Sequence, residues 1–296
     1  MKTQEDVVTL LRTEETYNDV RAAQARALLA DFKRTAVQVG DEITATLMWT
    51  REQALCAHLL YQQAFSQLKA YDYHGGWCTL ERAEIALNSV RRHVNDQDWT
   101  ELHLDFVATQ VEQWQSLFPY TLFLSPEIIQ HEKRCSICGA TVGFRAKCKH
   151  RKGQVYGGEL CIHIVRRAEI ISISLVTKPV QKYSTLEPFE LADGKDPGKT
   201  AYLAVRYTID RLQSPYHSWR AHKGTRRHSH ALYAAYKSSG LCPCGGTKLY
   251  SECCLSEPGV LRPHIDIEFD VSPPEELLVV EYSEAPEPSS STSRTG

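Results

Sequence analysis

The first 130 residues carry apolar side chains at three- and four-residue spacing, with few glycines and prolines, which predicts a bundle of α-helices. Gly40 is expected to end an early helix. Thr50 and Gln53 have the spacing of a capping box, and the helix that they would start runs toward a turn at the glycine pair 75–76. A second pair with this spacing, at positions 98 and 101, predicts the start of the last helix.

The pattern changes after Pro119 to cysteine, glycine, lysine and β-branched residues, so a domain boundary is expected near residue 130. A small β-containing module is predicted over 131–185, with a strand in residues 169–180. Residues 186–200 hold glycine, proline and acidic residues and are predicted to form a linker.

Helical spacing returns in residues 201–240, which are predicted to form a helical segment. A last module is expected over 241–282, where the alternating segments 264–269 and 276–282 could pair as a hairpin. Residues 283–296 are of low complexity and are expected to be a disordered tail.

Composition changes this picture mainly through the cysteines. Apolar residues make up 42% of the chain and charged residues 24%, as in ordinary globular proteins, which argues against a disordered, collagenous or coiled-coil chain. Ten cysteines are too few for a disulfide scaffold of this length, and the first residues are too charged for a secretory signal. No apolar stretch is long enough for a membrane helix. We therefore expect a cytoplasmic protein with no membrane partner, whose thiols are free or bound to metal.

Charge is segregated along the chain. Residues 131–182 hold 11 Lys and Arg against 3 Asp and Glu, and residues 195–238 hold 9 against 2. Residues 1–130 hold 11 against 18, and residues 255–296 hold 2 against 9. The basic middle predicts a surface for an acidic protein, RNA, the ribosome or DNA, with Tyr216 and Trp219 offering planes for stacking. Neutralisation of this surface by the chain's own acidic ends is the alternative.

Four cysteines near the C-terminus have the spacing of a closed zinc site. Cys242 and Cys244 are separated by one residue, and after eight intervening residues Cys253 and Cys254 follow as a pair. Thiolates bind Zn²⁺ in tetrahedral geometry, so two pairs joined by a turn can supply all four ligands. Two disulfides are the alternative, which a reducing compartment disfavours.

The segment CPCGGTKLYSECC resembles the SEC-C motif, the zinc-binding tail of the bacterial preprotein-translocase ATPase, which also occurs on other bacterial proteins. The resemblance covers about thirteen residues and implies zinc ligands at Cys242, Cys244, Cys253 and Cys254, with a role in holding a protein partner. Of the motif's lysine-rich turn only Lys248 remains.

A second zinc site is predicted in the central module, where CxxCG is followed by CxH. The expected ligands are Cys135, Cys138, Cys148 and His150. Cys161 and His163 repeat the CxH spacing and could replace the second pair, or pack beneath it.

These observations favour an α+β protein of bacterial or phage type, with an α-helical N-terminal domain followed by two small zinc-stabilised modules. Two zinc ions are expected, each held by four protein ligands, and no catalytic residue or other cofactor is assigned. The predicted function is a non-enzymatic interaction or adaptor protein. The alternative is a nuclease or toxin-like effector that carries the SEC-C segment for targeting, but the sequence lacks a phosphate-binding loop, a nucleophile elbow and an HExxH motif.

Overall fold

The computed structural model describes residues 3–12, 19–144, 148–186 and 201–272, which form an α+β protein as predicted. The chain divides into two compact units, Met1–His217 and Ser218–Gly296. None of the described helices has both the length and the apolar character needed to cross a bilayer. Nearly all of the expected linker, the second strand of the expected hairpin and the expected tail lie outside the described residues.

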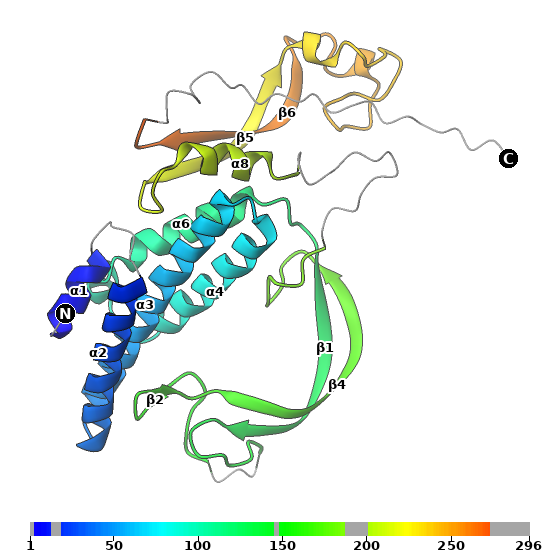
Figure 1. The fold of residues 1–296 in the computed structure, drawn as a ribbon. Helices are drawn as coiled ribbons and strands as arrows, with labels where there is room; N and C mark the ends of the chain where they lie inside the picture. The colour runs from blue at the N-terminus through cyan, green and yellow to red at the C-terminus, as the bar shows by residue number, and fades with distance from the viewer. Residues whose placement is uncertain (1–2, 13–18, 145–147, 187–200, 273–296) are drawn as a thin grey trace. The chain divides into compact units, whose positions relative to one another are not determined.

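Helices build the first unit around α3, which contacts α1, α2, α4, α6 and α8 (Figure 1). The bounds are α1 Gln4–Arg12, α2 Asp19–Gln38, α3 Glu42–Lys69, α4 Tyr73–Arg91, α5 Asp96–Glu101, α6 Leu104–Leu117 and α8 Leu203–Arg211. The core includes the fully buried side chains of Leu55, Leu80, Trp114 and Ile209. Because Ile209 belongs to α8, a helix from beyond the central module completes the N-terminal bundle.

The predicted start of α3 is wrong. Gly40, with a φ of 74°, ends the preceding turn, and Asp41 caps α3 by accepting a 3.0 Å hydrogen bond from the backbone N–H of Thr44. Thr50 lies inside the helix, where its hydroxyl donates to the carbonyl of Thr46 at 2.9 Å. Both sites have cap-forming residues, and the one directly after the glycine break starts the helix.

The other two predicted boundaries also move. The glycine pair 75–76 lies in the first turn of α4, whose N-cap is Asp72, and not in the turn before it. Residue 98 is likewise inside α5, where its backbone N–H donates to the Asn95 side chain at 2.8 Å. The following helix, α6, starts separately after His103, which adopts a left-handed conformation with a φ of 55°.

A long two-stranded ribbon leaves the bundle and carries the central module. It consists of β1 (Phe123–Cys135) and β4 (His163–Val176), paired antiparallel from Phe123 opposite Val176 to Cys135 opposite His163. Most of the strand predicted in residues 169–180 is confirmed as part of β4. The boundary expected near residue 130 falls inside β1, because the chain is already extended from Phe123.

Both ends of this ribbon are tied to the helices. Near its base, the indole N–H of Trp77 donates to the carbonyl of Lys182 at 2.7 Å. At the far end, a short hairpin of β2 (Val155–Tyr156) and β3 (Glu159–Leu160) returns to the bundle. There the backbone N–H of Gly157 donates to the Glu42 carboxylate at 2.8 Å, and the His93 ring donates to the Gly153 carbonyl at 3.1 Å. Figure 1 shows the ribbon bowing away from the helices between these contacts.

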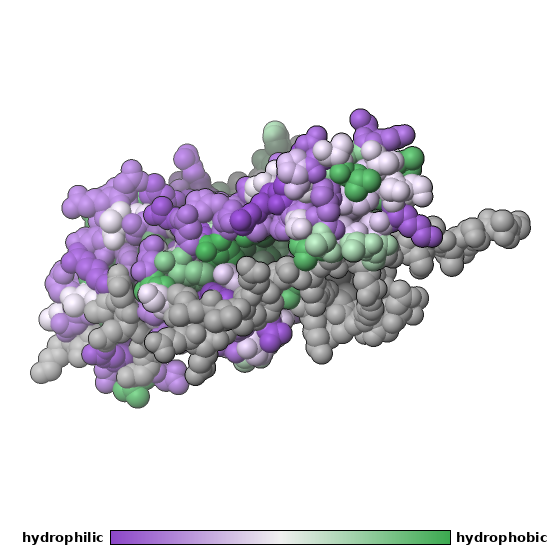
Figure 2. All heavy atoms as spheres, turned by 90° about the horizontal axis from the view of Figure 1, so that it is seen from above, coloured by the Kyte–Doolittle hydropathy of each residue, from purple (hydrophilic) through white to green (hydrophobic). Residues whose placement is uncertain are grey.

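The second unit contains an antiparallel pair, β5 (Trp219–His228) and β6 (Val260–Phe269), with short 3₁₀ helices at His230–Tyr233 and Tyr250–Glu252 between them. The prediction of a helical segment over 201–240 is therefore wrong beyond α8. Beyond Trp219 and Ala221 the sequence of β5 is polar and has no apolar period, so its partner strand determines its conformation. In the view of Figure 2, hydrophilic residues cover most of the described surface, with smaller hydrophobic patches between them.

Candidate metal centres

The first centre begins where β1 ends. Cys135 is the last residue of the strand, and its carbonyl accepts a hydrogen bond from the N–H of Gly139 at 2.9 Å. The turn needs the positive φ of Gly139, 69°, and it returns Cys138 toward Cys135. On the other side of the centre, the ring of His150 packs edge-on against Tyr156 with centroids 4.6 Å apart. Sequence analysis did not identify Tyr156 as part of the site.

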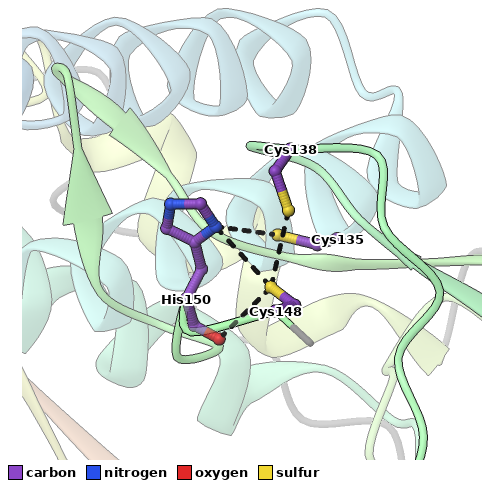
Figure 3. Close-up of side chains that lie close together, drawn as sticks. All are labelled: Cys135, Cys138, Cys148 and His150. Carbon is purple, nitrogen blue, oxygen red and sulfur yellow. Dashed lines mark hydrogen bonds between the residues drawn. The ribbon is translucent and has the colours of Figure 1, made fainter. Parts of the chain in front are cut away.

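The four predicted ligands converge on one point (Figure 3). The Nδ1 atom of His150 lies 3.7 Å from the sulfur of Cys135 and 3.6 Å from that of Cys148, which is 3.5 Å from the sulfur of Cys138. The centre of a regular tetrahedron with such edges lies about 2.2 Å from each corner, close to the Zn–S and Zn–N bond lengths of about 2.0 to 2.3 Å. All four donor atoms lie within 4.8 Å of one another, so this set fits a zinc ion.

Cys161 is a fifth thiol beside this centre. Its side chain is fully buried, and its sulfur lies 3.7 Å from that of Cys135. Four donors lie within 4.8 Å of one another, and this group contains Cys148 and His150 but not Cys161. His163 starts β4 opposite Cys135 and is also outside this group. The structure thus favours the first of the two ligand sets left open by the sequence.

The two neighbouring thiols, Cys135 and Cys161, differ in pKa. The backbone N–H groups of Cys138 and Ile137, with the thiols around them, lower the pKa of Cys135 to about 6. Burial and the neighbouring Cys135 raise the pKa of Cys161 to about 11. Desolvation and the neighbouring Cys138 and Cys135 thiols also raise the pKa of Cys148, so the positions of the donor atoms, and not their protonation, distinguish the ligands from Cys161.

The second centre is a compact loop in the C-terminal unit. The N–H of Cys242 donates to the carbonyl of Lys248 at 2.9 Å, and Gly245 turns the chain with a φ of 87°. The sulfur of Cys253 lies 3.7 Å from that of Cys244 and 3.9 Å from that of Cys254. Together with Cys242, all four sulfurs lie within 4.8 Å of one another, which fits a second zinc ion.

This second centre is also the core of its module. Cys242 and Cys254 are buried among Tyr233, Tyr250 and Val260. Burial raises the pKa of Cys242, but the backbone N–H groups of Cys244 and Cys254 and the adjacent thiols lower it more, so that it lies at about 7. The apolar cluster is small, so we expect a bound metal to contribute much of the module's folding free energy.

Two side chains outside the predicted ligand sets hold this loop in place. His230 bridges the Tyr250 hydroxyl at 2.6 Å and the Glu257 carbonyl at 2.8 Å, so it is a structural link and not a metal ligand. The guanidinium of Arg262 donates to the carbonyl of Pro243 at 2.6 Å, between two of the cysteines. No local sequence signal marks these contacts, because each joins residues 19 to 27 positions apart.

Comparisons with protein-family models, with curated proteins and with solved structures found no match to this chain. The two metal centres and the surfaces around them are therefore the basis on which a function is proposed.

Proposed function

We propose that this protein is a non-enzymatic interaction protein whose two zinc ions are structural. The observation that carries this proposal is that each centre brings four Cys or His donors within 4.8 Å of one another. Four such donors complete a tetrahedral zinc, whereas a catalytic zinc keeps a position for water or substrate. Each ion would then fix loops whose own apolar contacts are few.

The partner proposed is an acidic macromolecule in a reducing compartment such as the cytoplasm. All ten cysteines are free thiols, as binding of zinc requires. Four of the ten residues of β5 are Lys or Arg, and all four are exposed. The likeness to the SEC-C motif also supports a binding role, since the motif's implied task is to hold a protein partner.

Metal analysis and cobalt substitution test this proposal together. The purified protein is expected to contain two zinc ions per chain. After exchange with Co²⁺, its visible spectrum should show tetrahedral thiolate coordination that cyanide or azide leaves unchanged, because no ligand position is open. Fewer than one zinc per chain, or a spectrum that shifts when the anion binds to the metal, would contradict the structural role.

A further inference from the structure

The β5–β6 ribbon carries a concentration of positive charge at the end that adjoins the second metal centre. Side chains alternate between the two faces of a strand, and the register sets Arg226 opposite Arg262 and Gly224 opposite His264. His228, two residues beyond Arg226, shares their face. We call Arg226, His228, Arg262 and His264 the basic face.

The members of the basic face contact one another. The rings of His228 and His264 lie 5.5 Å apart, and a guanidinium nitrogen of Arg226 is 3.5 Å from Nε2 of His264. Burial lowers the pKa of His228, and the neighbouring His264, Arg226 and Arg262 lower it further. The fixed positive charge of the basic face is therefore that of Arg226 and Arg262.

Within the part of the chain that the structure describes, carboxylates do not balance the arginines of this face. Neither Arg226 nor Arg262 forms an ion pair with a described residue. Asp266 contacts His264 at 3.1 Å, and Glu257 pairs at 3.0 Å with Arg227, whose side chain belongs to the opposite face. Arg226 is exposed and Arg262 is partly buried against Pro243, so Arg226 is the better placed of the two to meet an external anion.

We infer that the basic face binds the phosphate groups of a nucleic-acid backbone. This inference rests on the proposed function, because the second zinc centre positions Arg262 through Pro243. Guanidinium groups match phosphate oxygens in geometry as well as in charge. A two-stranded ribbon is narrow enough to enter a groove of a duplex. An acidic protein is the weaker candidate, because protein interfaces centre on apolar anchors and the exposed residues of this face are charged or polar.

Fluorescence anisotropy with a short labelled single-stranded RNA and a mixed-sequence DNA duplex tests this inference on the full chain. Arg226→Gln is expected to weaken binding about tenfold at low salt and to reduce the salt dependence by about one phosphate contact. Arg220→Gln is the matched control: this arginine is on the same face of β5, but at the other end and opposite Glu268, so the affinity should change little. Arg262→Gln should weaken binding as well.

Zinc content is measured in the same samples, so that the two proposals fail separately. If every variant retains two zinc ions and neither probe binds to the wild-type protein at low salt, the inference is overturned and the proposed function stands. Equal affinities of wild type and Arg226→Gln for nucleic acid would also overturn the inference. Binding to polyglutamate that nucleic acid does not displace would overturn it as well, and would indicate an acidic protein partner. Loss of zinc from the wild-type protein would instead refute the proposed function.

Discussion

The Nδ1 atom of His58 lies 3.2 Å from the hydroxyl oxygen of Tyr216, which joins the middle of α3 to the chain beyond α8. On its other side, Nε2 of His58 lies 2.9 Å from the carbonyl of Leu102. Since a carbonyl only accepts, Nε2 carries the proton and Nδ1 accepts from the tyrosine. The tyrosine hydroxyl in turn accepts from the Gln62 amide at 2.8 Å. This buried arrangement requires a neutral imidazole.

Acid should therefore destabilise the first unit through His58. Burial lowers the pKa of His58 from 6.5 to about 4. The unfolded chain takes up this proton below pH 6.5, whereas the folded chain resists it until about pH 4, so stability is complete above pH 6.5 and falls as the pH drops through this window. The loss is on the order of 3 kcal/mol. Urea unfolding followed by helix circular dichroism, at several pH values, measures it.

Acid also releases zinc from thiolates, so the variant His58→Gln is needed as a reference. The wild type should lose more stability than this variant between pH 6.5 and pH 4. His222→Gln, on an exposed position of β5, should keep the wild-type pH profile. Parallel profiles for wild type and His58→Gln would show that the buried imidazole does not cause the loss.

The roles of Cys148 and Cys161 are separable by substitution with serine. Cys148→Ser is expected to lower the zinc content from two ions to one, because the remaining donors leave the tetrahedron incomplete. Cys161→Ser should retain both ions, although it places a hydroxyl in a fully buried site at a cost of about 1 to 3 kcal/mol. Metal analysis after dialysis against a mild chelator measures both. If Cys161→Ser lost one ion and Cys148→Ser lost none, Cys161 and not Cys148 would be the ligand.

Cys244→Ser should unfold the C-terminal module and leave the helices intact. The metal there organises a small core, and structural zinc contributes roughly 10 to 16 kcal/mol in isolated modules. The described α-helices all belong to the first unit, so the far-UV helix signal is expected to persist while one zinc is lost. Cys56→Ser is the control, since this partly buried cysteine of α3 lies in neither centre. A collapse of the helix signal in Cys244→Ser would mean that the units depend on each other.

A methyl group at position 259 should weaken the β5–β6 ribbon. A Cβ atom on Gly259 would lie 2.5 Å from the carbonyl oxygen of His228, and backbone cannot yield as a flexible side chain does. Gly259→Ala is expected to cost about 1 to 3 kcal/mol. Gly224→Ala, on the same ribbon with nothing within 4 Å, should cost little. Amide hydrogen exchange of peptides from β5 and β6 should be tenfold or more faster in the first variant, and equal rates in the two would contradict the clash.

The metal ligands could be predicted from the sequence because zinc binding depends on residue type and on short spacing, as in Cys242 and Cys244. The start of α3 could not, since Asp41 and Thr50 both satisfy the local rules for a cap and only the packed helix distinguishes them. The strand β5 was missed for a different reason. Its hydrogen bonds run to β6, more than thirty residues away, so its own sequence does not reveal its conformation.

The β1–β4 ribbon is held to the helices at both of its ends. One support is the Trp77 contact near its base, and the other is the hairpin that meets Glu42 beside the first metal centre. A ribbon held at both ends is expected to bend less than one held at a single end. Without zinc the loops at the first metal centre would hold the hairpin less firmly. The ribbon would then be fixed only near Trp77, and its outer end would move more. We therefore expect the first metal centre to limit the motion of the whole ribbon, and not only that of the loops that it joins.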